Sequence, residues 1–449
     1  MAHVAPYSRR NKVTYTFKRG IHIEEHKNTE HAKIVRLPDP ATVSIPLSQH
    51  IGAPCKPLVK VGDSVKVGQK IGDVESGLGC PVHSSVSGKV KAILPILTFS
   101  GAYVEHVIIE SDGEHTISED VKPWDKPLEE TTPEEIISII REAGISGMGG
   151  AGFPTYAKIS SAIGRVDTMI INCAECEPYI TANHRLLVEY PESVVGGAAI
   201  IRRALGLDSC VISIEDNKPD AIEILTKYTE NDSAVEVLRL KTKYPQGDER
   251  QLIYAVTRKE LPSGKLPADV GCVVFNAETV AAVWRAFTYG LPLTARIVTV
   301  DGDCVTSPGN LHVPIGASFR DCIEFCGSLK AEPRILISGG PMMGGTQWNP
   351  DAPVTKGVSA ILVLSADMVV DPVADRSCIR CGRCVSVCPM RLMPNYMAAF
   401  SRRGLYERAA EFGVRSCVEC GCCSFVCPSG VQIVQGIRLA KAKLAQKKV

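Results

Sequence analysis

The feature that most constrains this chain is a pair of cysteine runs near its C-terminus. The run that begins at Cys378 and the run that begins at Cys417 both follow the spacing C-x2-C-x2-C-x3-C-P. This spacing lets three thiolates hold one face of a four-iron cluster while the fourth reaches the neighbouring cluster. We therefore expect two [4Fe–4S] clusters with crossed ligand sets. The sets are Cys378, Cys381, Cys384 and Cys427 for one cluster, and Cys417, Cys420, Cys423 and Cys388 for the other.

Zinc is the alternative metal, because C-x2-C pairs also form zinc sites. A zinc site would need two pairs of ligands, whereas each run here has four spaced cysteines and ends in Cys-Pro. The spacing therefore favours iron–sulfur clusters. Cys422 fits no ligand position, and we expect it to be a packed thiol.

Composition excludes several other classes of protein. With 45% hydrophobic and 22% charged residues, the chain is globular rather than disordered. It has 18 cysteines, and residues 1–19 lack the apolar core of a secretory leader, so metal binding is favoured over disulfides. No stretch approaches about 18 uncharged apolar residues, so no membrane span is expected. A net charge of +1 argues against a nucleic-acid partner.

The region that carries the cysteine runs is basic. Residues 371–449 contain 13 Lys and Arg against 5 Asp and Glu. The apolar spacing predicts one or two helices over 393–413 and another over 431–446. Part of the surplus positive charge offsets the anionic clusters. The remainder suits either an acidic redox partner or anionic lipid, and the charge pattern leaves both open.

A second signal is the glycine-rich segment from Gly144 to Gly152. It contains G-x-G-x-x-G, but residues 133–143 before it have helical spacing after a capping Thr132, so the order is not that of a Rossmann motif. The exposed N–H groups of such a loop can bind phosphate, with Lys158 one turn into the next helix. A plain tight turn is the alternative.

Polar residues follow the strands predicted after this loop. The segment 168–172 is typical of a buried strand, and Glu175 and Glu177 come directly after it. Segments 244–249 and 275–279 repeat this arrangement of polar residues beside a turn or a strand end. In parallel α/β sheets, ligands bind at the carboxyl ends of the strands. The sequence therefore predicts a ligand site there.

Together these segments resemble the flavin-bearing, NADH-oxidising subunit of respiratory complex I. The resemblance implies a non-covalently bound FMN and NAD(H) as substrate. The residues that it implicates are Gly147, Gly149, Gly150, Lys158, Asn172, Glu175, Glu177, Tyr244, Gly247, Glu249, Asn276 and Thr279.

The chain departs from that family at Met148, Ala174 and Asp248, where arginine, aspartate and glutamate are usual. The first two departures concern nicotinamide binding more than flavin binding. The complex I subunit also has a single C-terminal cluster, whereas this chain has two runs.

The two runs, with Glu175–Ala182 and Gly52–Val59, more closely resemble the RnfC family of the Rnf complex, a membrane-bound ferredoxin:NAD oxidoreductase that moves Na⁺ or H⁺. The resemblance covers nearly the whole chain. It implies a peripheral position on the cytoplasmic face of the cell membrane. Its implied partners are the other Rnf subunits, including integral membrane subunits and a ferredoxin-like subunit.

The expected fold class is multidomain α/β plus β. Residues 1–115 are similar to a lipoyl-type barrel-sandwich hybrid with an N-terminal extension, but Gly77–Cys80 at its hairpin tip has no lysine to modify. Residues 130–290 form a complex I-like flavin- and NADH-binding α/β domain. Residues 291–350 resemble a β-grasp module, and 371–449 form a helical two-cluster ferredoxin module.

Two smaller features leave alternatives open. The loop Gly339–Gly345 is either a contact for a small ligand or partner, or a structural turn. Cys173 and Cys176 form C-x2-C, which is either a redox pair or, as their place beside the acidic residues indicates, part of the site wall.

The expected activity is hydride exchange between NADH and FMN, followed by single-electron transfer through the two clusters, in either direction. One alternative is a soluble NADH-dependent cobalamin reductase of the same architecture. A second is an electron-transfer adaptor without flavin. A third is a ligand-sensing scaffold built on the two β modules, which would explain neither cysteine run.

Overall fold

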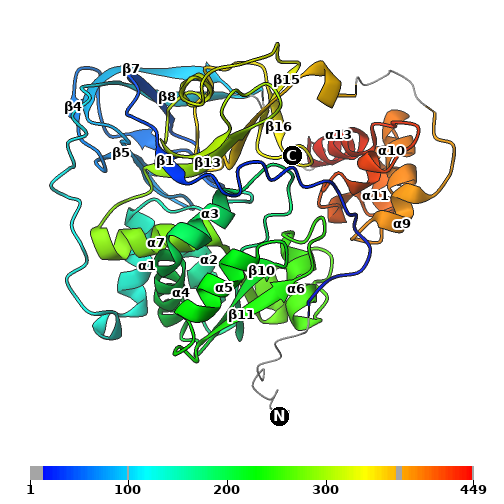
Figure 1. Cartoon of the computed structure of the whole chain (residues 1–449), viewed down its shortest axis with the longest axis horizontal. Coiled ribbons are helices and arrows are strands. Elements are labelled where there is room, and N and C mark those ends of the chain that lie inside the picture. The colour runs from blue at the N-terminus through cyan, green and yellow to red at the C-terminus, as the bar shows by residue number, and fades with distance from the viewer. Residues whose placement is uncertain (1–13, 99–100, 371–376, 447–449) are drawn as a thin grey trace.

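The computed structural model describes residues 14–98, 101–370 and 377–446. Figure 1 shows a β module (blue to cyan), an α/β domain (green), a second β module (yellow) and a helical C-terminal module (orange to red). The expected fold class is confirmed. Most of the N-terminal segment expected to lack a leader, and the first residues of the expected cluster module, lie outside the described residues.

The α/β domain is built on a four-stranded parallel sheet. Its central strand is aliphatic and buried on both faces, as parallel strands covered by helices must be. The register places Asn172 beside Asn276 and Ser213, so the carboxyl ends of the strands meet at one edge. In spatial order the strands are β11 (Val235–Leu240), β10 (Cys210–Glu215), β9 (Thr168–Asn172) and β12 (Cys272–Asn276).

Helices cover this sheet. A capping box between Thr132 and Glu135 starts the first of them, and the glycine loop follows it, so the predicted order helix, loop, helix is confirmed. The helices are α1 (Pro133–Glu142), α2 (Thr155–Ala162), α3 (Ala182–Glu189), α4 (Pro191–Leu205), α5 (Pro219–Tyr228), α6 (Glu249–Thr257) and α7 (Ala277–Tyr289). Short 3₁₀ turns lie at η1 (Leu128–Glu130), η2 (Pro267–Val270), η3 (Ala366–Met368) and η4 (Val414–Ser416).

The N-terminal β module consists of two small sheets packed around a core of valine and isoleucine. One sheet, in spatial order, contains β2 (Thr42–Pro46), β8 (Tyr103–Ser111), β7 (Gly88–Leu97) and β4 (Ser64–Val65). The other contains β3 (Lys56–Pro57), β5 (Lys70–Asp73) and β6 (Val82–His83). No lysine lies between β5 and β6, in agreement with the absence of a modification site predicted there.

Two buried histidines make this module sensitive to acid. Burial lowers the pKa of His106 from 6.5 to about 4, and burial lowers the pKa of His83 well below 6.5. An unfolded chain therefore binds more protons than the folded one between these pH values, so stability falls as the pH drops from about 6.5 to about 4. We expect His106→Asn to flatten this part of the pH profile of the thermal unfolding midpoint. The exposed His31→Asn is the control, and an unchanged profile in His106→Asn would contradict the prediction.

The second β module is a six-stranded mixed sheet with one short helix, α8 (Phe319–Phe325). Two of its strands lie outside the expected limits 291–350. In spatial order the strands are β1 (Ile34–Arg36), β14 (Gly309–Pro314), β13 (Ala295–Asp301), β17 (Ala360–Leu364), β15 (Ile335–Ser338) and β16 (Gly345–Gln347). The N-terminal extension thus supplies an edge strand to this sheet, since Ile34 pairs with Asn310.

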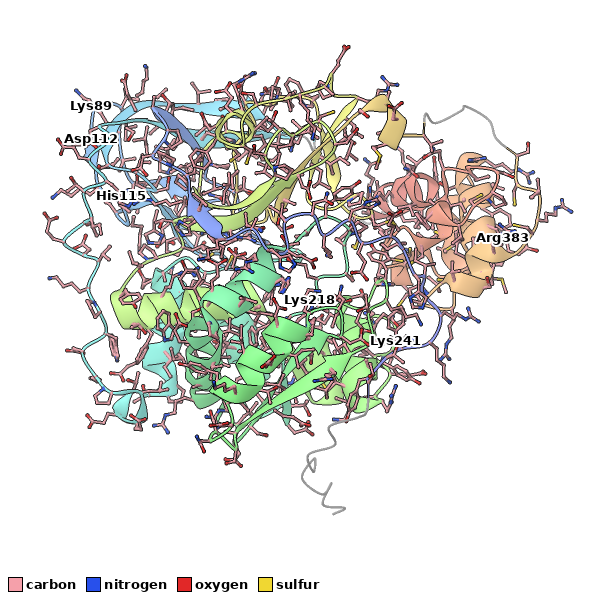
Figure 2. All side chains as sticks on the ribbon, in the orientation of Figure 1. Lys89, Asp112, His115, Lys218, Lys241 and Arg383 are labelled. Carbon is pink, nitrogen blue, oxygen red and sulfur yellow. The ribbon has the colours of Figure 1, made fainter. Side chains whose placement is uncertain are left out.

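The C-terminal module is helical, and the two long helices pack through fully buried Met397 and Ile437. Its helices are α9 (Arg383–Val387), α10 (Pro394–Arg402), α11 (Tyr406–Glu411), α12 (Cys422–Phe425) and α13 (Ile433–Gln446). In the part of the chain that the structure covers, every helix is too short or too polar to cross a bilayer. Arg383 in this module and His115 beside the first β module mark opposite ends of the molecule in Figure 2.

Residues 14–30 form a strap between the α/β domain and the C-terminal module, the dark blue trace in Figure 1. Ile21 exchanges backbone hydrogen bonds of 2.9 Å with Tyr244, while the N–H of Gly20 donates to the carbonyl of Val387 at 3.0 Å. Arg19 Nη1 also donates to the carbonyl of Val385. The strap therefore fixes the C-terminal module against the strand ends of the α/β domain.

Candidate functional site

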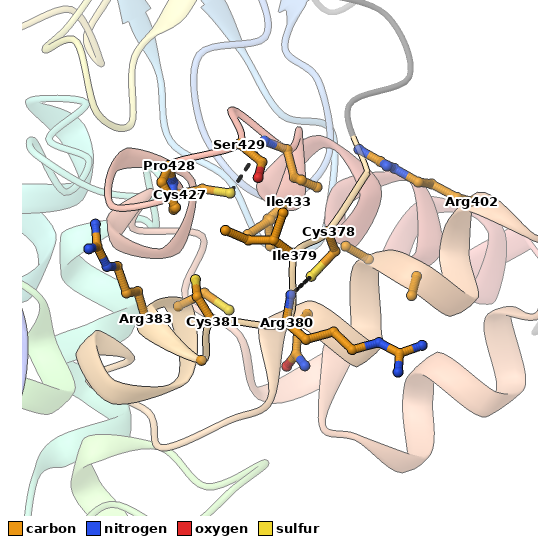
Figure 3. A pocket seen from close by; sticks show the side chains of 16 residues that line it. Cys378, Ile379, Arg380, Cys381, Arg383, Arg402, Cys427, Pro428, Ser429 and Ile433 are labelled. Carbon is orange, nitrogen blue, oxygen red and sulfur yellow. Dashed lines mark hydrogen bonds between the residues drawn. The ribbon is translucent and has the colours of Figure 1, made fainter.

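The first predicted ligand set lines one pocket of the C-terminal module. Cys378, Cys381, Cys384 and Cys427 surround this pocket, as Figure 3 shows for Cys378, Cys381 and Cys427. Cys378 and Cys381 are exposed, so the pocket opens to solvent. We name these four residues the outer set.

The second predicted set lines a separate pocket nearer the α/β domain. Cys388, Cys417, Cys420 and Cys423 surround it, and Cys422 lies in the same wall. Cys420 and Cys422 belong to an apolar core that also contains Ile21 of the strap and Tyr244. We name these four ligand residues the inner set. The exchange of the fourth cysteine between runs, predicted from spacing, is therefore present in the structure.

The two runs fold as repeats, with equivalent residues 39 positions apart. The N–H groups of Arg380 and Glu419 each donate to the sulfur two residues earlier at 3.4 Å, and both residues have a positive φ, 58° and 59°. Gly382 and Gly421 then start the equivalent helices α9 and α12. Amide donors to sulfur stabilise thiolate, the form that ligates iron.

The spacing of these sulfurs fits a cluster rather than one ion. Within the described residues, no three His, Cys, Asp or Glu side chains are close enough to hold a single metal ion. Zinc would require four sulfurs about 2.3 Å from one point. Cysteines that instead surround a cavity suit a cubane held at its corners.

The glycine loop lies against the strand ends of the α/β domain. The N–H of Met148 donates to Thr279 Oγ1 at 2.9 Å, which joins the loop to the first turn of α7. Asn276 caps α7 by accepting from the N–H of Glu278. The N-terminus of α7 therefore faces the loop, and a helix N-terminus stabilises a bound phosphate.

Lys158 joins two further helices to the same place. Its Nζ lies 2.9 Å from Glu249 Oε1 in the first turn of α6, and 5.5 Å from the ring centre of Phe275 at the end of β12. The pair is partly exposed, with 30% of the Lys158 side chain and 40% of the Glu249 side chain accessible. Lys158 is thus a cation that a phosphate can reach.

Asn172 fixes the loop that carries Gly247. Its side-chain N–H donates to the carbonyl of Gly247 at 2.9 Å, and its oxygen accepts from the N–H of Ala174. The N–H of Gly247 donates to Cys176 Sγ at 3.4 Å. Burial raises the pKa of Cys176 strongly, so this sulfur is a neutral thiol that supports the loop. Its contact agrees with the interpretation of Cys176 as part of the wall.

The two acidic residues after β9 point in different directions. The carboxylate of Glu175 accepts from the N–H groups of Asn183 and His184, so it is turned to the amino end of α3. Glu177 accepts from the hydroxyl of Tyr244 at 3.3 Å and from the N–H of Met342 at 3.0 Å.

Tyr244 also donates to the carbonyl of Cys420 at 2.7 Å. The strand-end residues are therefore in direct contact with the inner set. Burial raises the pKa of the Glu177 carboxyl to about 7, although both of its hydrogen bonds favour the charged form. Gly421 packs against Met342, so the loop Gly339–Gly345 is a structural turn between two modules.

Polar atoms around the glycine loop lack protein partners. Among the described residues, Ser146 Oγ and Thr155 Oγ1 on either side of the loop are buried without a hydrogen bond. Both amide atoms of Gln246, next to Gly247, are in the same condition. Buried polar atoms in proteins normally have a partner. These residues, with Lys158 and the N-terminus of α7, fit a flavin phosphate and its polar ring edge.

Gly149 tests this interpretation. Its φ is +86°, and a Cβ there would meet Asn276 Nδ2 at 3.0 Å. Gly149→Ala should displace Asn276 from the loop and lower FMN affinity at least about 10-fold, the equivalent of about 1.4 kcal/mol. Fluorescence titration of FMN into flavin-free protein measures the change. Gly164→Ala is the matched control, because its φ is +70° but nothing lies within 4 Å of the added carbon. Equal losses in both variants would contradict the prediction.

Sequence reasoning did not identify Lys27. Its Nζ donates to the carbonyls of Glu175, Glu177 and Ile180 at 2.7–2.8 Å, and so holds the segment after β9 in place. Lys27 lies about 150 residues away in the chain, and no local pattern marks it.

Family models match four parts of the chain. They are described as the Nuo51 FMN-binding domain over residues 140–285, the RnfC barrel sandwich hybrid domain over 15–114, the SLBB domain over 297–345 and a 4Fe-4S dicluster domain over 377–431. These matches confirm FMN and [4Fe–4S] clusters as the cofactors. The individual flavin- and cluster-binding residues remain predictions.

Two curated relatives are similar over most of their length. The RnfC-type component of the Na⁺-translocating ferredoxin:NAD⁺ oxidoreductase complex of Acetobacterium woodii is 45% identical over 96% of this chain and 97% of its own. Its counterpart in the proton-translocating complex of Clostridium ljungdahlii is 43% identical over 88% and 86%. The NAD⁺-reducing [NiFe]-hydrogenase in its H₂-reduced state shares the fold, with 20% identity, a TM-score of 0.51, and 72% of this chain and 63% of its own covered.

The flavin domain and the two cysteine sets define an iron–sulfur flavoprotein of the electron-transfer class. Within that class, the chain belongs to the RnfC family, whose members are components of ion-translocating ferredoxin:NAD⁺ oxidoreductase complexes. It is therefore one subunit of a multi-subunit complex. This membership decides against the soluble cobalamin reductase, and the FMN-binding domain decides against an adaptor without flavin.

Proposed function

We propose that this chain carries electrons between NAD(H), at the strand ends of the α/β domain, and a partner subunit at the outer set. The observation that carries the proposal is the contact of Tyr244 with both Glu177 and Cys420. It joins the predicted flavin site directly to the inner set. When bound, FMN supplies the chemistry that converts two-electron hydride transfer into single-electron steps.

The residues of this chain position the cofactors and exclude water between them. Lys158 and the N-terminus of α7 would hold the flavin phosphate, while Asn172 and Cys176 hold the Gly247 loop against the site. Ile21, Tyr244, Cys420 and Cys422 form a continuous apolar core, so the space between the strand ends and the inner set is dry. A dry, rigid connection reduces the solvent reorganisation that accompanies electron transfer.

Departures from the complex I pattern support weaker nucleotide contacts than in that family. The side chain of Met148 is buried, and the carboxylate of Asp248 caps α6 by accepting from the N–H groups of Arg250 and Gln251. Ala174 has no polar group to offer. The nicotinamide step therefore relies on the remaining residues of the site, among them Glu249.

The outer set is the exit toward a partner. Its two exposed cysteines lie beside Arg380 and Arg383, both on the surface in Figure 3. A basic rim attracts an acidic protein and speeds its association. We propose that a ferredoxin-like subunit docks here and that integral membrane subunits hold the complex at the cytoplasmic face of the membrane.

An anaerobic titration of the reconstituted protein with NADH tests the proposal. Absorption reports the flavin and electron paramagnetic resonance reports the clusters. Bleaching of the flavin followed by a cluster signal is the expected result. A flavin that stays oxidised in NADH would overturn the nucleotide part of the proposal. A reduced flavin with silent, intact clusters would overturn the connection through Tyr244.

A further inference from the structure

A cavity of about 220 Å³ lies where the two β modules meet the α/β domain, at the end of the molecule away from both cysteine sets. Figure 2 labels His115 beside it and Arg383 at the opposite end. Four basic side chains line the cavity: Arg36 and His115 near the first β module, Arg285 on α7 and His312 on β14.

Arg285 brings an uncompensated charge to this cavity. The nearest buried carboxylate, Glu278, already accepts from Arg296 Nε at 2.9 Å and Nη2 at 2.8 Å, and from the N–H of Ile297. In the regions that the structure covers, the guanidinium of Arg285 makes no hydrogen bond and no ion pair. Burial lowers its pKa, because the surroundings replace water poorly as a partner. Leaving a desolvated cation unpaired is costly.

The other groups in the cavity do not neutralise Arg285. Asp39, with 6% of its side chain exposed, is engaged by Arg36 Nη2 at 3.1 Å and by His115 Nδ1 at 2.6 Å. His312 has a pKa of about 4, because burial and the charge of Arg285 both oppose protonation. At neutral pH it is an uncharged imidazole, which can still donate one hydrogen bond.

We propose that this cavity binds a small oxyanion, such as a phosphate or a carboxylate, with Arg285 as its charged partner and His312 as a flanking donor. A guanidinium matches two oxygens of either group with two parallel N–H bonds. Because the walls come from three modules, a bound anion would also hold the modules together. The site is separate from the flavin phosphate site, which lies at the other end of α7.

Equilibrium dialysis with radiolabelled orthophosphate tests the proposal on anaerobic, FMN-saturated protein, in which the flavin phosphate subsite is already filled. We expect about one exchangeable phosphate per chain, displaced by acetate if carboxylates share the site, and unaffected by chloride at equal ionic strength. Arg285→Gln should abolish binding. Arg165→Gln, on the surface of the same domain, should leave it unchanged. No binding, equal displacement by chloride, or full binding by Arg285→Gln would each overturn the proposal.

Thermal unfolding provides a second readout that does not depend on the labelled ion. The midpoint of the wild-type protein should rise with phosphate, because a ligand that binds only the folded state stabilises it. Arg285→Met should lose this dependence and, without phosphate, should unfold no earlier than the wild type, since it removes an unpaired cation. A variant that unfolds earlier without phosphate, together with a wild-type midpoint indifferent to phosphate, would make Arg285 a structural residue only.

Discussion

Cys423→Ala should stop electrons from reaching either cluster, while Cys384→Ala should stop them only at the second. The two residues are equivalent in the repeats, but Cys423 belongs to the inner set and Cys384 to the outer set. Each variant should retain about four of about eight irons. In NADH, the Cys384 variant should still show a reduced cluster signal, whereas the Cys423 variant should show a reduced flavin alone.

Iron analysis and electron paramagnetic resonance measure both quantities on the same samples. Cys422→Ala is the matched control, because this thiol lies in the wall of the inner pocket but fits no ligand position. It should retain about eight irons. Identical behaviour of the Cys384 and Cys423 variants in NADH would contradict the order of the two sets.

Lys158→Ala should lower FMN affinity by about 10- to 100-fold, which is the value of one hydrogen bond to a charged group. The lysine is the cation that faces the glycine loop from α2, and its loss leaves the carboxylate of Glu249 unpaired beside the site. Repulsion between that carboxylate and a phosphate adds to the loss. Flavin content after gel filtration and fluorescence titration measure the change, and iron content should stay the same.

Glu249→Gln separates a flavin contact from a structural ion pair. If Lys158 binds phosphate, removing the charge of Glu249 frees the lysine and should retain flavin, although the nucleotide step should weaken. If the pair only joins α2 to α6, both variants should lose stability equally and flavin only as a consequence. Thermal unfolding of the flavin-free proteins distinguishes the two results.

Local patterns in the sequence determined the kinds of element and the kinds of chemistry. The Thr132 capping box, the buried run 168–172 and the two cysteine spacings each act over about ten residues, so the sequence alone predicts α1, β9 and the crossed cluster ligands. The fourth cysteine of each run follows from the same arithmetic, because a cubane needs three near ligands and one distant one.

Only the tertiary structure decided how the parts are joined. Glu175 and Glu177 look equivalent in the sequence, yet backbone direction after β9 turns the first toward α3 and the second toward Tyr244. The strap through Ile21, the support from Lys27 and the cavity around Arg285 all depend on residues more than 100 positions apart. Contacts at that separation result from packing of whole modules, and no periodicity or spacing in the chain encodes them.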